Sequence, residues 1–157
     1  MKLYLVRHGD YLVDASNPAG ALSRKGKDNI QNLADFLKSS SIHVSSFFHS
    51  GKLRAQQTAD LLSKSVVCND KVTARSGLDP LDDVIPIANE IEAIEEDVLL
   101  VGHLPFLGKL VAKLIINDEN RELVIFNPGT MICLEQVGNK HWVINWIMNA
   151  SLLKKEI

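Results

Sequence analysis

The chain has 157 residues, of which 46% are hydrophobic and 23% are charged, the balance of an ordinary soluble globular protein. This length fits one domain, so we expect residues 1–157 to fold as a single domain with a substantial core. The formal net charge of −2 argues against a general nucleic-acid-binding protein, which usually carries a strong basic excess.

The first sixty residues alternate between strand and helix patterns. The run Lys2–Val6 is short and apolar, which predicts a buried strand. Ser23 is placed to cap a helix whose apolar face repeats at helical spacing through Ile30, Leu33, Ala34 and Leu37. The next two segments predict a second strand and a second helix, at Ser45–His49 and Leu53–Ser63.

The same alternation continues through the middle of the chain. Val72–Ala74 predicts a short strand, and isoleucines at helical spacing predict a helix over residues 87–94. The clearest strand is Val98–Val101, which ends in Gly102-His103. Pro105 then suits the first turn of a fourth helix.

After Asn117 the pattern changes to strand-like runs separated by turn signals. The three runs are Leu123–Phe126, Met131–Glu135 and Trp142–Ile147. On a regular strand Trp142 and Trp146 share one face, where we expect both in the core. The whole pattern predicts an α/β protein, a three-layer α/β/α sandwich with a mostly parallel central sheet and added edge strands.

The cysteines and the start of the chain bear on location. Cys68 and Cys133 form neither a CxxC pair nor a zinc-ligand spacing, so we expect buried apolar residues. The apolar stretch before Arg7 is too short for the apolar region of a signal peptide, and no run approaches the ~18 residues of a membrane span. We therefore expect a cytoplasmic protein with no membrane partner.

Chemically distinctive residues follow the predicted strands. Arg7-His8-Gly9 follows the first strand and Gly102-His103 follows the strongest one. Arg54 lies in the first turn of a helix that follows another strand. Because ligands of open α/β sheets bind at the carboxyl ends of the strands, these segments are expected to meet in one pocket.

Two arginines and two histidines suit a phosphoryl group. The planar guanidinium matches phosphoryl oxygens bidentately and stays charged, while a neutral imidazole can attack phosphorus covalently. If arginines supply the positive charge, no metal and no cofactor is needed. Taken singly, each residue also has a structural interpretation, so the pattern indicates an anion or phosphate site without fixing His8 as a nucleophile.

Three motifs resemble those of the histidine phosphatase superfamily. Residues 5–9, Leu-Val-Arg-His-Gly, resemble its Arg-His-Gly signature after the first strand. Residues 50–59 resemble the second motif, a serine followed by Arg-Ala and Gln-Thr-Ala, and Val101-Gly102-His103 resembles the third. Gly51 departs from the pattern, since proline is common there. The resemblance implies a phosphoglycerate-mutase-like fold.

The length, Arg7–Asp10 and Gly102–Pro105 resemble the SixA-like phosphohistidine phosphatase branch. Too few residues separate Arg54 from His103 for the helical cap of larger members, which implies an open, shallow pocket. The branch implies removal of phosphate from a histidine-phosphorylated protein, such as a phosphotransfer domain or phosphocarrier, in signal transduction. We expect a monomer.

The resemblance also implies roles. His8 is the nucleophile, and Arg7, Arg54 and His103 hold the phosphoryl oxygens or another oxyanion, with His103 cationic or donating. Gly9 is implied to pack closely and to orient His8 through its carbonyl.

The roles of other residues near the motifs are less clearly indicated by the sequence. Ser50 is implied to support the pocket, and Asp79 is a candidate general acid in the loop after the third strand. His49 is interpreted as structural or surface-exposed, although it stands near enough to reach the rim. In the loop Asp10–Asn17, the sequence does not say whether any residue contacts substrate, and we expect its polar residues mainly to solvate the loop.

Three alternatives stay open. A general small-molecule phosphomonoesterase would use an acid near Asp79. A non-catalytic phosphate-binding module would not need a nucleophile. A metal enzyme would use His8 and His103, although no carboxylate stands at ligand spacing from either.

Overall fold

The computed structural model describes residues 1–154, and its centre is a six-stranded sheet in the order β5-β3-β6-β1-β7-β8. Pairing is parallel between β5 and β3, β3 and β6, and β6 and β1, while β7 runs antiparallel to both β1 and β8. The strands are β1 (Lys2–Arg7), β3 (Ser46–His49), β5 (Thr73–Ala74), β6 (Val98–Gly102), β7 (Thr130–Val137) and β8 (His141–Asn149). The mostly parallel sheet predicted from the sequence is confirmed.

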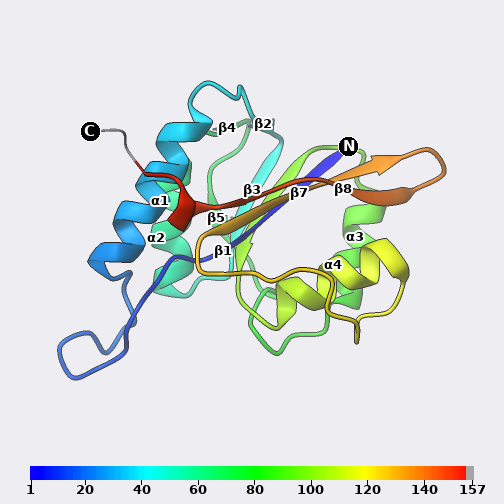
Figure 1. Cartoon of the computed structure of the whole chain (residues 1–157). Helices are drawn as coiled ribbons and strands as arrows, with labels where there is room; N and C mark the ends of the chain where they lie inside the picture. Colours follow the sequence, from blue (N-terminus) through cyan, green and yellow to red (C-terminus); the bar gives the residue numbers. More distant parts are fainter. Residues whose placement is uncertain (155–157) are drawn as a thin grey trace.

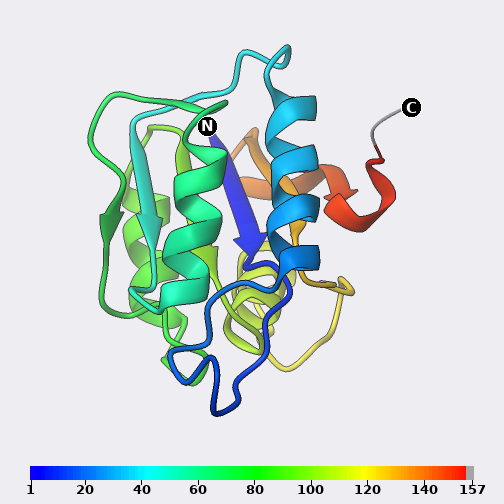
Figure 2. The same cartoon turned by 90° about the vertical axis from the view of Figure 1, so that its left-hand side faces the viewer.

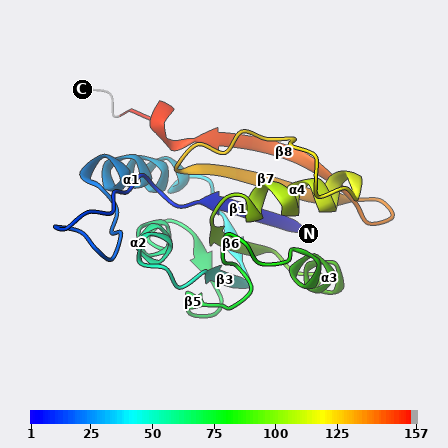
Figure 3. The ribbon, with the colours of Figure 1, turned by 90° about the horizontal axis from the view of Figure 1, so that it is seen from below.

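Helices cover both faces of the sheet, which gives the predicted three layers (Figure 1, Figure 3). In Figure 3, α1 (Arg24–Leu37) and α2 (Leu53–Leu62) lie on one side of the sheet, and α3 (Ile85–Ala93) and α4 (Phe106–Ile116) lie on the other. Figure 2 looks onto the face covered by α1 and α2. Outside the main sheet are a small parallel pair, β2 (His43–Val44) with β4 (Val67–Cys68), and a 3₁₀ turn at Ala150–Leu152.

The alternation of side chains along β1 divides the core into two clusters. Leu3 and Leu5 pack toward α3 and α4, whereas Tyr4 and Val6 pack toward α1 and α2. Such alternation is what a strand buried on both faces requires, since successive side chains point to opposite faces of the sheet. Ser23 caps α1 as predicted, because its hydroxyl accepts a hydrogen bond from the Gly26 amide at 3.0 Å.

Two predictions for the last third of the chain are wrong. Residues 123–126 form no strand and run as an irregular segment, although alternate side chains there are buried. The tryptophans also separate: Trp142 joins the α3/α4 cluster, while Trp146 packs on the α1/α2 cluster. A register shift opposite Cys133/Leu134 inserts Asn145 into β8, and one extra residue reverses the faces beyond it.

The two cysteines and the lengths of the helices can be compared with the predictions from the sequence. Cys133 is buried, Cys68 is half-buried, and both are free thiols. Within residues 1–154, the structure holds no helix of the length and apolarity that a bilayer crossing requires.

Candidate active site

The pairing of β1 with β6 brings the two motif histidines together. Arg7 is in register with Gly102, and the His8 amide donates to the Gly102 carbonyl at 3.1 Å. Parallel neighbours end at the same sheet edge, so the His8 and His103 rings emerge side by side, with their centroids 4.8 Å apart. The meeting of these segments at the carboxyl ends of the strands was predicted from the sequence.

The His8 ring is held by its own main chain. Its Nδ1 lies 2.8 Å from the carbonyl oxygen of Gly9. A carbonyl oxygen can only accept a hydrogen bond, so Nδ1 carries the proton and a neutral ring keeps its lone pair on Nε2. A Cβ on Gly9 would lie 3.0 Å from Ile30 and 3.1 Å from Leu22, so glycine lets this turn pack tightly against α1.

Ser50 fixes the second histidine. Its Oγ lies 2.6 Å from His103 Nε2 and accepts a hydrogen bond from the Lys52 amide at 3.3 Å. A serine hydroxyl can donate to Nε2 or accept from it, and the bond from Lys52 is compatible with both. Where Ser50 donates, the proton of a neutral His103 ring lies on Nδ1. That Nδ1 is buried and has no hydrogen-bond partner in the described part of the chain.

Both arginines also carry an unused donor. The Nε atoms of Arg7 and Arg54 are buried and have no partner among residues 1–154. Arg7 Nη1 donates to the carbonyl of Phe126 at 2.6 Å, and the Arg54 guanidinium carbon lies 4.2 Å from the centre of the Tyr11 ring. Because buried polar groups are normally paired, the unpaired Nε donors of Arg7 and Arg54, together with the unpaired Nδ1 of His103, indicate a site built for an acceptor such as an oxyanion.

The second motif ties α2 to the loop that carries His8. Thr58 is fully buried, and its hydroxyl donates to the Arg54 carbonyl at 2.8 Å while accepting from the Gly9 amide at 3.1 Å. Gln57 accepts a hydrogen bond from the Leu22 amide at 2.8 Å. The Gln-Thr pair therefore holds the backbone around His8 in place.

Both site histidines favour the neutral form in the free protein. Burial, assisted by the charges of Arg54 and Arg7, lowers the pKa of His8 to about 4 despite its bond to Gly9 and the nearby Asp10 carboxylate. Burial is also the largest cause that lowers the pKa of His103 to about 3, followed by the adjacent His8. For His103 in the free protein, the neutral ring is therefore favoured over the cationic one, and its role as a donor stays a prediction.

The candidate acid stands apart from these rings. The Asp79 carboxylate lies 3.6 Å from Lys52 Nζ, and its side chain is 55% exposed. No hydrogen bond joins it to either histidine in the portion of the chain described. Asp79 therefore lies at a solvated rim formed with Lys52, and its role as a general acid stays a prediction.

The uncertain residues of the sequence mostly have structural partners. His49 is buried, and its Nδ1 accepts from the Gly51 amide at 3.1 Å, which fits the structural interpretation. Asp14 accepts hydrogen bonds from the amides of Ser16 and Asn17, and the Asn17 side chain bonds Leu12 and Ala21. The polar residues of this loop therefore shape the loop itself.

Sequence reasoning missed Tyr11 and the Phe126 carbonyl. The Tyr11 ring meets the His8 ring edge-on, with centroids 5.1 Å apart, and it stacks on Arg54. No motif marks it, because an aromatic residue two positions after a histidine has no special meaning. The site is also less open than the lack of a cap implies, because Tyr11 stands beside His8 and only 4% of the His8 surface is exposed.

Proteins similar to this chain in sequence or in fold include phosphatases. The chain is 28% identical over 159 residues to phosphohistidine phosphatase SixA of Escherichia coli strain K12, covering 98% of this chain and 97% of that protein. A solved structure of the protein histidine phosphatase SixA complexed with tungstate superimposes with a TM-score of 0.85 at 25% identity, covering 98% and 100% of the two chains. A mycobacterial glucosyl-3-phosphoglycerate phosphatase shares the fold, with a TM-score of 0.70 at 16% identity over 94% and 98%.

The family model of the histidine phosphatase superfamily (branch 1) matches residues 3–82, just over half of the chain. That stretch contains the first two motifs, and the likeness to SixA supports a phosphatase function. This chain belongs to the histidine phosphatase superfamily.

Proposed function

We propose that the protein removes phosphate from histidine-phosphorylated proteins through a phospho-His8 intermediate and without a metal ion. The observation that carries the proposal is the locked His8 ring, whose Nδ1 is 2.8 Å from the Gly9 carbonyl, so that Nε2 is left as a nucleophile beside unpaired cationic donors. The depressed pKa of His8, about 4, keeps that lone pair available at neutral pH.

The reaction proceeds in two displacements. In the first, His8 Nε2 forms a bond to phosphorus while the P–N bond of the substrate breaks, and the substrate imidazole leaves with the electron pair and takes a proton from the solvent. In the second, a water oxygen attacks the phospho-His8 phosphorus and gives a proton back to the solvent, and His8 is regenerated with its lone pair as inorganic phosphate departs. The net reaction consumes one water for each phosphohistidine hydrolysed.

Charge stabilisation falls to the arginines in this scheme. A phosphoryl transition state is loose and spreads charge over the peripheral oxygens, so preorganised donors supply most of the acceleration. Arg7, Arg54 and His103 Nδ1 are the donors, and Ser50 holds the His103 ring. A bound phosphoryl dianion would also raise the pKa of His103 and strengthen its hydrogen bond.

Two features favour phosphohistidine as the substrate. An imidazole leaving group needs less acid assistance than an alkoxide, and the structure places Asp79 in an exposed ion pair with Lys52 rather than against His8. In addition, within residues 1–154 the one helix between α2 and β6 is α3, which packs against α4 in the core on one face of the sheet. A side chain displayed on another protein then meets no helical cap.

The test uses a histidine-phosphorylated phosphocarrier or phosphotransfer protein, in excess chelator, with loss of the phosphoryl label followed in time. His8→Ala is compared with His141→Ala, because His141 is an exposed residue of β8 and serves as a matched histidine removal. We expect rapid clearance by the wild type and by His141→Ala, and none by His8→Ala.

An aryl phosphate serves as a second substrate. Cleavage of the aryl phosphate alone would sink the phosphohistidine assignment and favour the small-molecule phosphomonoesterase, in which Asp79→Asn should then slow poor leaving groups more than good ones. Loss of activity in chelator that returns with added metal would contradict the metal-free mechanism.

A further inference from the structure

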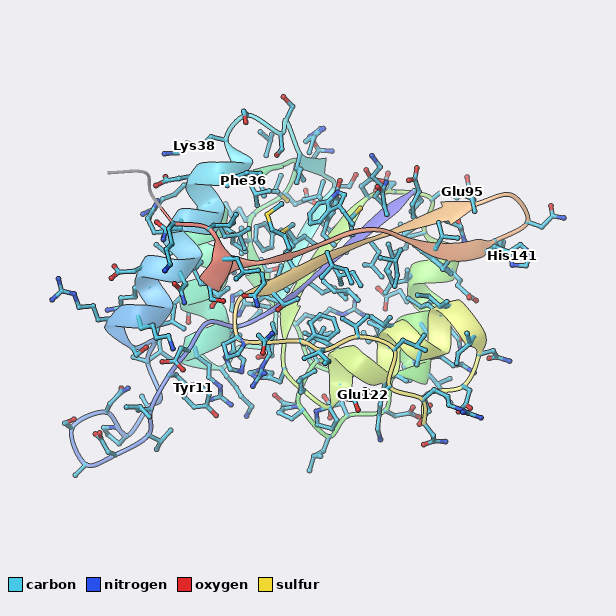
Figure 4. The ribbon with its side chains drawn as sticks, viewed as in Figure 1. Tyr11, Phe36, Lys38, Glu95, Glu122 and His141 are labelled. Atoms are coloured by element: carbon cyan, nitrogen blue, oxygen red, sulfur yellow. The ribbon has the colours of Figure 1, made fainter. Side chains whose placement is uncertain are left out.

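The Tyr11 side chain touches groups that different elements bring to the site. Its ring lies against the Arg54 guanidinium of α2, with 4.2 Å from the guanidinium carbon to the ring centre. Its edge meets the ring of His8, which follows β1, at an interplanar angle of 79° and a centroid distance of 5.1 Å. Tyr11 is therefore in contact with the expected nucleophile and with one expected phosphoryl ligand. Figure 4 labels Tyr11 on the loop between β1 and α1.

The position of this ring is fixed by the loop that carries it. Tyr11 forms a β-bridge with Leu22, and the Leu22 amide is bonded to Gln57 of α2. Gly20 has a positive φ of 67° and lies close to both Tyr11 and Arg54. A Cβ built on Gly20 would stand 3.5 Å from Tyr11 Cδ2 and 3.6 Å from Arg54 Nη1. The loop thus passes close to both the Tyr11 ring and the Arg54 guanidinium and keeps them together.

Arg54 has little else to orient it. No carboxylate within residues 1–154 forms an ion pair with it, and its buried Nε has no hydrogen-bond partner there. The face of an aromatic ring attracts a guanidinium and restricts it to a stacked plane. A guanidinium binds two phosphoryl oxygens at once most effectively when the orientation of its plane is set before the phosphoryl group arrives.

We propose that Tyr11 is a positioning residue of the oxyanion site, which holds the Arg54 guanidinium in the plane that receives a phosphoryl group and shields the His8 ring from water. The proposal rests on the proposed function, in that Arg54 is taken to bind the phosphoryl group. It assigns to Tyr11 no contact with the reacting atoms.

The first measurement is the affinity of inorganic tungstate, an oxyanion probe, by isothermal titration calorimetry. Tyr11→Leu should weaken binding about three- to thirty-fold, as expected for loss of one cation–π contact, while Tyr11→Phe keeps the ring face and should stay within about two-fold of the wild type. Tyr11→Met is measured alongside, so that a leucine variant that fails to fold leaves the test intact. Leu12→Ala, an exposed neighbour on the same loop, is the matched control and should bind normally.

A double-mutant cycle separates positioning from a general loop effect. If Tyr11 acts through Arg54, then Tyr11→Leu should weaken tungstate little further when Arg54 is already alanine. An equal loss in both backgrounds, or a loss in Leu12→Ala of the same size, would overturn the proposal.

The second readout is the pKa of His8, followed by the NMR signals of its ring. Burial is the main cause of its low value of about 4, and the groups that face it are the Gly9 carbonyl, Arg54, Arg7, Asp10 and the neighbouring His103 ring. Tyr11→Leu should admit water and move this pKa toward 6.5, whereas Tyr11→Phe should not. No movement in the leucine variant would refute the shielding role.

These outcomes are distinguishable from those of the proposed function. Tungstate affinity needs no turnover, so a wild-type protein that binds tungstate but leaves phosphohistidine intact would refute the function and leave the role of Tyr11 standing. A wild type that clears phosphohistidine, with tungstate affinity unchanged in Tyr11→Leu, would refute only the role of Tyr11.

Discussion

The two histidines of the site are surrounded by positive charge and kept out of water. Burial is the largest cause that lowers the pKa of His8 and of His103, and the charges of Arg54 and Arg7 lower both further. A cationic imidazole has no lone pair with which to attack phosphorus, so this environment selects the form that a nucleophile needs. In the proposed mechanism the guanidiniums carry the charge that an anionic substrate requires, so that the arginines bind the phosphoryl group and the histidine attacks it.

The first prediction concerns the titration of His8. Histidine ring signals followed by NMR from pH 8 to pH 4 should show His8 still neutral at pH 5.5, because burial holds its pKa at about 4. The resonance is assigned by its absence from the spectrum of His8→Ala. If the assigned ring titrates near the usual 6.5, the buried environment described for it is wrong.

At the scale of elements, the strands and helices with strong patterns were predicted well, and the segments that depend on pairing were not. The apolar run of β6 and the spaced apolar face of α1 leave little choice, since both must be buried. Residues 123–126 alternate as a strand would, yet the Phe126 carbonyl accepts Arg7 Nη1 and no strand pairs with the segment within residues 1–154. Alternation shows which side chains are buried but cannot show what the backbone bonds to.

The same distinction applies to single residues in the site. The sequence could bring His8, Arg7, Arg54 and His103 together in one predicted site because each lies at a strand end or in the first turn of a helix. Tyr11 was missed because it lies in a loop whose path depends on the Asn17 and Gln57 side chains. The extra residue at Asn145 could not be predicted either, since a bulge leaves no mark in hydrophobicity.

The second prediction tests how α1 is joined to the His8 loop. Helix propensity alone says that Gly26→Ala should stabilise α1 by about 1 kcal/mol. In the structure, however, a Cβ at Gly26 would lie 2.2 Å from the carbonyl oxygen of Asp10 and 2.9 Å from its amide nitrogen. The backbone at Asp10 would have to move, so Gly26→Ala should instead lower the free energy of unfolding by about 1–3 kcal/mol.

The matched control is Gly108→Ala in α4, where the nearest atom to an added Cβ is 4.0 Å away in Leu104. That change should raise the free energy of unfolding by about 0.5–1 kcal/mol, because alanine restricts the unfolded chain and nothing is displaced. Urea unfolding of both variants measures the difference, and a stabilised Gly26→Ala protein would show that α1 does not press on Asp10.

At the scale of the whole molecule, the two histidines of the candidate site also affect the stability of the fold. The sheet order places β6 beside β1 in parallel, and this contact lies in the middle of the sheet with helices on both faces. His8 and His103 are consequently held by central elements and buried almost completely, with 4% and 1% of their surfaces exposed. Burying two imidazoles in their neutral form has a consequence for folding that depends on pH.

The third prediction is that stability declines on mild acidification, and its sign follows from proton binding. The folded pKa values of His8 and His103, about 4 and about 3, lie below the ordinary 6.5 of an unfolded histidine. Between pH 6.5 and pH 5 the unfolded chain therefore binds more protons than the folded one, and unfolding becomes easier as the pH falls. Each ring should cost about 2 kcal/mol by pH 5, since one pKa unit corresponds to about 1.4 kcal/mol.

Urea unfolding of the wild type at several pH values between 7 and 5 should show this loss. A variant that carries both His8→Gln and His103→Gln keeps neutral, polar side chains at the two positions, so its free energy of unfolding should fall much less over the same range. His49, whose pKa burial also lowers, is present in both proteins and contributes equally to both curves. Parallel curves for the two proteins would show that His8 and His103 are protonated as readily in the folded chain as in the unfolded one, and the neutral nucleophile would lose its physical basis.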